Sequence, residues 1–358
     1  MLKRRNFEIF LKNVNYKNIK KPFFKIFING ISFYFEIKYL FHFYKNQTLS
    51  VKKMEPHFSP TLPLSNGMSI PLIGLGTYAG ENFEILLKAA LDIGYRHLDT
   101  AKVYKNEKQI GKVLAEVFKE GKIKREDLFI TTKIWNDPNL DTFEAMKESL
   151  RDLNVDYVDL LLNHWPIGVP SADKTKMVAK PLHVFWKEIE RCHKEGLCKA
   201  VGVSNFGCQA LMDLLTFAEI KPVVNQLEAS PYLTQVDLIN WCQKIGVQVI
   251  AYSPLCRGGT DVKEVFGDIV DIFNDPVLKE IAAKHKRSIA QVVLNFMVKR
   301  GIAVIPKSSN PARLKDNFNC LDFELDEEDK KRIFALNKGY RTINPKKRED
   351  MLYYPAFD

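Results

Sequence analysis

Short apolar runs alternate with helix-like segments along most of this chain, and the alternation limits the folds open to it. The strand-like runs span residues 72–75, 96–99, 128–133, 158–163, 199–203, 223–227, 247–252 and 302–306. The helix-like segments span residues 83–92, 107–120, 141–153, 181–195, 207–217, 235–245, 276–285 and 289–299. Eight strands alternating with helices predict an α/β fold, specifically a single (β/α)8 TIM barrel.

A doubly wound sheet is the alternative fold, because it shows the same alternation. It would place GxGxxG after an early strand, and Gly74-Leu75-Gly76-Thr77-Tyr78 lacks the third glycine. Before the first strand, Asn66-Gly67 predicts an N-terminal β-hairpin. Long loops are expected over the C-terminal face of the barrel, at residues 166–180, 253–275 and in the tail from residue 339. In the second of these, Arg257-Gly258-Gly259-Thr260 predicts a lid.

The positive charge of the chain is concentrated in its first 53 residues. They hold 12 Lys and Arg and 2 Asp and Glu, whereas the other residues hold 41 of each, so the net charge of +10 belongs to this segment. A folded part without net charge argues against nucleic-acid binding. We therefore expect a basic, aromatic-rich extension at residues 1–53, disordered or arising from a mis-assigned start, and one folded domain at residues 54–358.

Neither a membrane span nor a metal site is predicted. The longest uncharged apolar run of the extension, residues 26–35, is too short for a bilayer, and no signal-peptide cleavage site is apparent. These features predict a cytoplasmic protein, with mitochondrial targeting by residues 1–53 as the alternative. The six cysteines lie between Cys192 and Cys320 without zinc-binding spacing.

Four polar side chains lie at or just after the ends of consecutive strand-like runs: Asp99, Tyr104, Lys133 and His164. Active sites of β/α barrels lie at the C-terminal ends of the strands, so we expect these side chains to meet. Carbonyl reduction needs a hydride, which a nicotinamide or flavin supplies, and a proton for the oxygen. A tyrosine with a pKa of about 10 is too weak an acid alone, but a Lys133 ammonium held by Asp99 would lower that pKa. Asp99 and Lys133 alone would suit a stabilising ion pair, whereas the four together predict a reductase.

These residues belong to motifs that resemble the aldo-keto reductases. The motifs are Gly-Tyr-Arg-His-Leu-Asp-Thr-Ala at residues 94–101 with Tyr104 beyond it, Thr132-Lys133-Ile134-Trp135, Asn163-His164-Trp165-Pro166, Gly202-Val203-Ser204-Asn205-Phe206, Tyr252-Ser253-Pro254-Leu255 and Ile305-Pro306-Lys307-Ser308. The resemblance runs from about Leu62 to Tyr354. It implies a barrel that binds NADPH without a Rossmann fold. It also implies Tyr104 as the general acid, Asp99 and Lys133 as its tuning partners, and His164 as the residue that orients the carbonyl group.

The strand ends also carry the residues expected to bind NADPH or NADP+. They are Thr77, Ser204, Asn205, Gln226, Tyr252, Ser253, Leu255, Lys307, Ser308, Arg313 and Asn317. The side chains of Ser204, Asn205 and Gln226 can hold a carboxamide, although Ser-Asn after a strand is also a common helix cap. Tyr252 offers a flat face for the nicotinamide ring.

The residues after the last strand indicate which dinucleotide is preferred. Lys307 and Arg313 can engage a ribose 2′-phosphate, which favours NADPH over NADH. The alternative is a solvated cluster of surface charges. Asp316 departs from the Glu or Gln that family members commonly carry there.

The substrate-binding wall is expected to comprise Tyr78, Val103, Trp135 and Trp165, with the C-terminal tail. Aromatic lining favours apolar or flat aldehydes and ketones. Trp165 after His164 resembles aldose-reductase-like members, and His164 stands where members that reduce steroid double bonds carry Glu. The predicted function is therefore NADPH-dependent reduction of aldehydes and ketones to alcohols by a monomer.

Two other function classes were weighed. The first is a non-catalytic nucleotide-binding barrel that acts as a regulatory or channel-associated subunit, suggested by the basic, aromatic extension. The second is a barrel metal hydrolase, which needs clustered His and Asp at strand ends and is rejected because His164 is the one histidine placed there. The motifs leave the physiological substrate and the direction of the reaction open.

Overall fold

The computed structural model describes residues 23–28, 31–36, 59–78, 83–256, 271–348, 351–354 and 357. The chain divides into two compact units, Met1–Pro56 and His57–Asp358. In the first unit, β1 (Phe23–Ile28) pairs antiparallel with β2 (Ile31–Glu36). The predicted lid at residues 257–260 lies outside the described residues.

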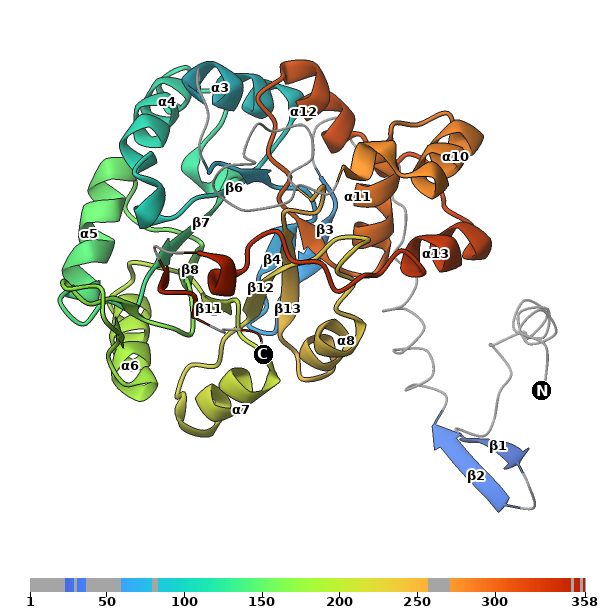
Figure 1. Ribbon diagram of the computed structural model, residues 1–358, viewed down its shortest axis with the longest axis horizontal. Coiled ribbons are helices and arrows are strands. Elements are labelled where there is room, and N and C mark those ends of the chain that lie inside the picture. The colour runs from blue at the N-terminus through green and yellow to red at the C-terminus, as the bar shows by residue number, and fades with distance from the viewer. Residues whose placement is uncertain are drawn as a thin grey trace. The chain divides into compact units, whose positions relative to one another are not determined.

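Eight parallel strands form the centre of the second unit (Figure 1). They are β5 (Leu75–Gly76), β6 (His97–Asp99), β7 (Phe129–Ile134), β8 (Leu160–Asn163), β11 (Val201–Ser204), β12 (Val224–Glu228), β13 (Gln248–Tyr252) and β14 (Ala303–Val304). Their order in the sheet follows their order in the chain. A parallel bridge between Ile73 and Val304, with a 2.8 Å hydrogen bond from Gly74 N to Val304 O, joins the first strand to the last. The predicted barrel is therefore confirmed.

Helices follow the strands and surround them (Figure 1). They are α3 (Phe83–Ile93), α4 (Glu107–Lys119), α5 (Thr142–Leu153), α6 (Leu182–Lys194), α7 (Cys208–Phe217), α8 (Val236–Lys244), α10 (Pro276–His285), α11 (Ile289–Lys299), α12 (Pro311–Phe318) and α13 (Glu327–Phe334). Local signals set several of their starts. Asp141 accepts two backbone N–H groups at the start of α5, and Ser288 with Gln291 forms a capping box on α11. Helices α12 and α13 were not predicted.

Apolar side chains form two layers, one inside the barrel and one between the strands and the helices. Leu160 and Leu162 of β8 point into the inner cluster, whereas Leu161 packs outward against the helices. The predicted hairpin, β3 (Thr61–Pro63) with β4 (Ser69–Pro71), adds Leu64 and Ile70 to the inner cluster. The barrel interior is thus a packed core, and chemistry is confined to the mouth.

One predicted loop contains regular structure. Residues 166–180 form a small hairpin of β9 (Val169–Pro170) and β10 (Met177–Val178). Gly168 permits this pairing, because it lies directly against the Val178 carbonyl, where a Cβ atom would clash. The hairpin places Met177 among the apolar side chains at the mouth.

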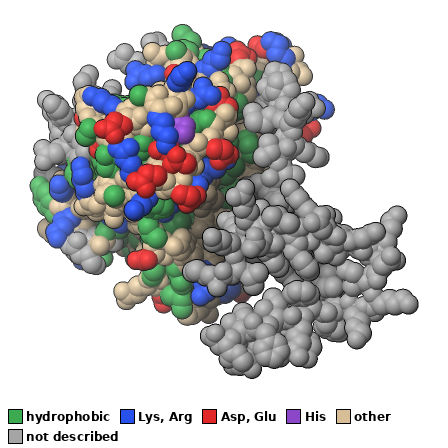
Figure 2. Space-filling view, turned by 90° about the vertical axis from the view of Figure 1, so that its right-hand side faces the viewer, with side chains coloured by type: hydrophobic (Ala, Val, Ile, Leu, Met, Phe, Trp, Pro, Cys, Tyr) green, Lys and Arg blue, Asp and Glu red, His purple; other side chains and the backbone are tan. Residues whose placement is uncertain are grey.

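The described surface is mixed in charge. Figure 2 shows Lys and Arg side chains interspersed with Asp and Glu on one face, and neither sign forms a continuous patch there. Within the residues that the structure describes, every helix is too short or too polar to cross a lipid bilayer.

Candidate active site

Three neighbouring strands bring the expected catalytic side chains together. Asp99 ends β6, Lys133 lies in β7 and His164 directly follows β8, while Tyr104 ends the short helix η2 (Lys102–Tyr104). Because these strands are adjacent and parallel, their C-terminal ends face the same mouth. The ring centroids of Tyr104 and His164 are 5.8 Å apart.

The Lys133 ammonium is surrounded by oxygen atoms. Its Nζ donates to Asp99 Oδ1 at 2.5 Å, to the Thr100 carbonyl at 2.7 Å and to the Tyr104 hydroxyl at 3.5 Å. Burial acts to lower the pKa of Lys133, but Asp99 and Tyr104 raise it more, so the net pKa lies above its ordinary value. Lys133 therefore stays charged beside the phenol.

Tyr104 has a raised pKa. Burial raises it, and Lys133 offsets that effect only in part. The expectation that Lys133 lowers the pKa of Tyr104 is right for the contribution of Lys133 and wrong for the net shift, because the phenol also loses solvent. The raised pKa keeps Tyr104 protonated at neutral pH, as a proton donor must be.

His164 is held in its neutral form. Burial, followed by the charge of Lys133, lowers the pKa of His164 well below its ordinary value. A neutral imidazole carries one N–H donor and one acceptor. The Trp135 ring lies 5.1 Å from the His164 ring, and the His164 carbonyl accepts a 2.9 Å hydrogen bond from Asn205. Backbone and aromatic contacts thus fix the imidazole over the mouth.

Expected cofactor residues form a chain of hydrogen bonds that reaches Asp99. Tyr252 donates its hydroxyl to Asn205 Oδ1 at 2.7 Å, and Asn205 Nδ2 donates to Ser204 Oγ at 3.1 Å. Ser204 in turn donates to the Gln226 carbonyl at 3.0 Å, and Gln226 Nε2 donates to Asp99 Oδ2 at 2.7 Å. The ends of β11, β12 and β13 are therefore joined to the oxygen that faces away from Lys133.

The other residues expected near the nicotinamide differ in their surroundings. Thr77 is buried and donates its hydroxyl to the Asp99 carbonyl at 2.9 Å, so it supports the end of β6. Ser253 directly follows β13 with a positive φ of 48°, and Leu255 packs against the main core.

The residues after β14 form an exposed polar corner at the start of α12. Asn310 caps this helix through two backbone N–H groups, and Ser308 Oγ donates to the Asn310 carbonyl at 3.2 Å. Lys307 and Arg313 are exposed, and Asn317 is buried one turn further on. A helix N-terminus with two cations suits a phosphate group.

The expected substrate wall is larger than the sequence indicated. Tyr78 and Val103 are 45% and 50% exposed at the rim, while Trp135 and Trp165 stack with their centroids 6.0 Å apart. Seven side chains pack together at this point, and we refer to them as the mouth cluster: Trp135, Trp165, Ile167, Met177, Ile343, Met351 and Phe357. The wall thus draws on the β9–β10 hairpin and on the tail.

Sequence reasoning missed two polar residues that organise the mouth. Asn106 accepts from Thr100 Oγ1 at 2.9 Å and donates to the Thr77 carbonyl at 2.7 Å, so it ties two strand ends together. Glu228 ends β12 and is 1% exposed. An acidic residue at the end of an apolar strand was the signal that pointed to Asp99, and the same signal was available for Glu228.

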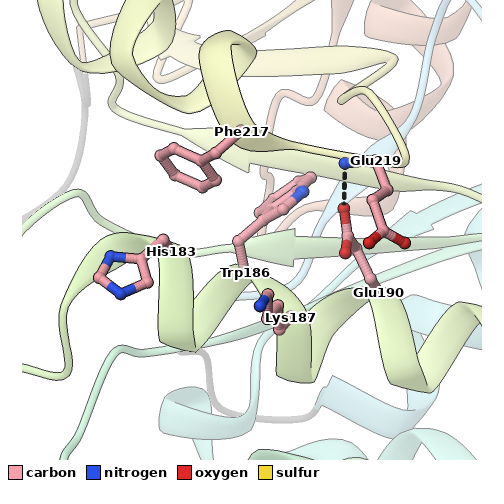
Figure 3. A pocket seen from close by; sticks show the side chains of 6 residues that line it. All are labelled: His183, Trp186, Lys187, Glu190, Phe217 and Glu219. Atoms are coloured by element: carbon pink, nitrogen blue, oxygen red, sulfur yellow. Dashed lines mark hydrogen bonds between the residues drawn. The ribbon is translucent and has the colours of Figure 1, made fainter.

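A separate cavity of about 470 Å³ lies between α6 and α7 (Figure 3), and none of the four expected catalytic side chains lines it. Its lining residues are His183, Trp186, Lys187, Glu190, Phe217 and Glu219. Glu190 is buried, and its Oε1 accepts from the backbone N–H groups of Glu219 and Ile220 at 2.8 and 2.9 Å. These contacts explain Glu190 as a buried link between α6 and the backbone that follows α7.

The catalytic geometry can be compared with known proteins. The family model for the Aldo/keto reductase family matches residues 73–338, which include the four convergent side chains. The chain belongs to the aldo/keto reductase family. The match spans the barrel from β5 to α13.

Individual aldo/keto reductases resemble the chain over most of their length. Aldose reductase C of Dictyostelium discoideum is 44% identical over 302 residues, which cover 79% of this chain and 91% of that protein. An NADP-dependent D-sorbitol-6-phosphate dehydrogenase of Malus domestica is 40% identical, with coverage of 80% and 97%. A solved structure of a Bombyx mori aldo-keto reductase in complex with NADP has a TM-score of 0.73 and 35% identity, covering 80% of this chain and 95% of that chain.

Proposed function

We propose that this aldo/keto reductase reduces aldehydes and ketones to alcohols with NADPH, and that Tyr104 supplies the proton. One observation carries the proposal: the buried Lys133 ammonium lies between Asp99 at 2.5 Å and the Tyr104 hydroxyl at 3.5 Å. A cation in that position stabilises the phenolate that remains after proton donation.

The residues present fit an NADPH molecule. Ser204, Asn205 and Gln226 form a buried polar row beside Asp99, and Tyr252 borders it. Where the adenine end of the cofactor is expected, Arg313 is exposed at the start of α12. It makes no ion pair with another residue in the described part of the chain. These residues would hold the carboxamide and the 2′-phosphate. The solved relative from Bombyx mori is described with NADP.

The chain's own side chains then have separable tasks. His164 donates one N–H hydrogen bond to the substrate carbonyl and orients it. Tyr104 gives its proton to that oxygen, and Lys133 stabilises the phenolate while Asp99 holds Lys133 in place. When bound, NADPH supplies the hydride. The mouth cluster excludes water from the reacting carbonyl.

The substrate is a small carbonyl compound, and the aromatic wall favours apolar or flat ones. A non-catalytic nucleotide-binding barrel, the alternative, would give no reason for a charged lysine and a protonated tyrosine to converge, and no finding favours it. We further propose a monomer in the cytoplasm, a location that the six free cysteines support because thiols persist in a reducing compartment.

The test is to follow NADPH absorbance after adding a panel of aldehydes and ketones to the purified protein. We expect oxidation of NADPH with aromatic aldehydes, and slower oxidation when NADH replaces NADPH. A panel without any turnover, in protein that binds NADPH, would instead support the non-catalytic barrel.

A further inference from the structure

A buried carboxylate outside the four-residue site lies where the barrel meets the C-terminal tail. Glu228 is the last residue of β12, and its register partner on β13 is Tyr252. It is 1% exposed. A buried carboxylate is costly unless donors surround it, so its partners indicate what it holds.

All three of its hydrogen bonds to the tail come from two consecutive residues. Glu228 Oε1 accepts from Thr342 N and from Thr342 Oγ1, each at 2.6 Å, and Oε2 accepts from Ile343 N at 2.9 Å. Burial raises the pKa of Glu228, and the Thr342 and Ile343 donors lower it in part. Hydrogen bonds to a carboxylate are among the strong hydrogen bonds in proteins. The end of β12 therefore holds the tail in place at this point.

Further hydrogen bonds hold the tail against the segment that follows β12. The Tyr232 carbonyl accepts from Lys338 N at 3.1 Å and from Tyr340 N at 3.0 Å. Asn337 Oδ1 accepts from Thr234 N at 3.1 Å. Residues 337–343 are therefore tied to residues 228–234, and Glu228 is the contact that lies at the barrel mouth.

The tail residues from Ile343 onward contribute side chains to the mouth cluster. Ile343, Met351 and Phe357 pack with Trp165 and with Trp135, whose ring is 5.1 Å from His164. In Figure 1 the red tail crosses the ends of the strands. A shift of the tail therefore changes the apolar wall beside the carbonyl-binding position.

We propose that Glu228 is a positioning residue that fixes the tail as one wall of the substrate pocket and so sets the preference for bulky apolar carbonyl substrates over small ones. This inference rests on the proposed function. A bulky substrate contacts the tail side chains and loses apolar contact when they are released, whereas a small aldehyde reaches only His164 and Tyr104.

Three variants separate anchoring from general destabilisation. Glu228→Ala removes the acceptors, and Glu228→Gln keeps one carbonyl oxygen for the Thr342 donors. Glu190→Ala is the matched control, because Glu190 is also buried and also accepts two backbone N–H groups, but from the segment that follows α7 (Figure 3).

The first measurement is tryptic cleavage between residues 338 and 348 in protein that retains its circular-dichroism spectrum. We expect Glu228→Ala to be cut there about tenfold faster or more than the unmutated chain, with Glu228→Gln close to the unmutated rate. The Glu190→Ala tail should be cut at the unmutated rate. Equal cleavage of the tail in Glu228→Ala and in the unmutated protein overturns the anchoring.

The second measurement compares KM for a bulky aromatic aldehyde with KM for a three-carbon aldehyde. We expect the ratio to rise about tenfold in Glu228→Ala and to recover in Glu228→Gln. A similar rise in Glu190→Ala, or no rise in Glu228→Ala, overturns the specificity role. Unmutated protein that reduces no carbonyl refutes the proposed function, and with it the specificity role, while tail cleavage still decides the anchoring.

Discussion

Breaking the buried Lys133–Asp99 pair should separate stability from catalysis. In Lys133→Met the Asp99 carboxylate keeps Gln226 as a donor but loses the ammonium at 2.5 Å. Removing one partner of a buried pair costs about 3–5 kcal/mol, because a charge is left uncompensated. Asp99→Asn leaves the 1%-exposed Lys133 without its carboxylate and should cost a similar amount.

The double variant Lys133→Met/Asp99→Asn contains neither charge, so we expect it to be within about 2 kcal/mol of the unmutated protein. Urea unfolding followed by tryptophan fluorescence gives the four free energies of unfolding. The cycle should show about 4 kcal/mol of coupling or more, because each single variant loses about 3–5 kcal/mol and the double variant stays within about 2 kcal/mol. Turnover should fall by about 10²–10⁴ in both single variants and should not recover in the double variant. Additive losses of stability would refute the buried pair, and recovered turnover would refute the role of Lys133.

Three further predictions concern stability, cofactor choice and the extension. Burial lowers the pKa of His97 to about 4 from 6.5, so between these two pH values the unfolded chain binds a proton at His97 and the folded chain does not. The free energy of unfolding should therefore fall by about 3 kcal/mol as the pH drops from 6.5 to about 4. The loss should be about 3 kcal/mol smaller in His97→Gln, where the contribution of His164 remains, and an equal loss in the variant and the unmutated protein in urea titrations would contradict the assignment. Arg313→Ala should weaken NADPH by about 10–100-fold in fluorescence titrations and leave NADH nearly unchanged, whereas equal losses would point to a structural role. A chain that begins at Met54 should reduce aldehydes as well as the full chain, and an inactive or insoluble product would make the extension structural.

The convergence of side chains could be predicted where a side chain and its strand are neighbours in the chain. Asp99, Lys133 and His164 each end or follow an apolar run, and parallel strands place such ends together. Tyr104 was found through its spacing from Asp99. These predictions needed no knowledge of long-range packing.

Features that depend on distant segments were missed. Glu228 and Thr342 are 114 residues apart, so their contact does not follow from local pattern. The tail was expected to form part of the substrate wall, but the side chains that it contributes were not identified. The raised pKa of Tyr104 also depends on tertiary burial, whereas the contribution of Lys133 could be predicted from its place near the end of a neighbouring strand. Gly168 allowed β9 and β10 to pair inside a predicted loop because their backbones approach closely.

The central claim is that Tyr104 gives the proton while other residues hold the cofactor. Single-turnover measurement of NADPH oxidation by Tyr104→Phe with an aromatic aldehyde tests it most directly, together with an NADPH titration of the same variant. We predict that NADPH binds with nearly unchanged affinity while the oxidation rate falls by about 10²–10⁴ or more. A variant that binds NADPH and oxidises it at a near-normal rate would contradict the account.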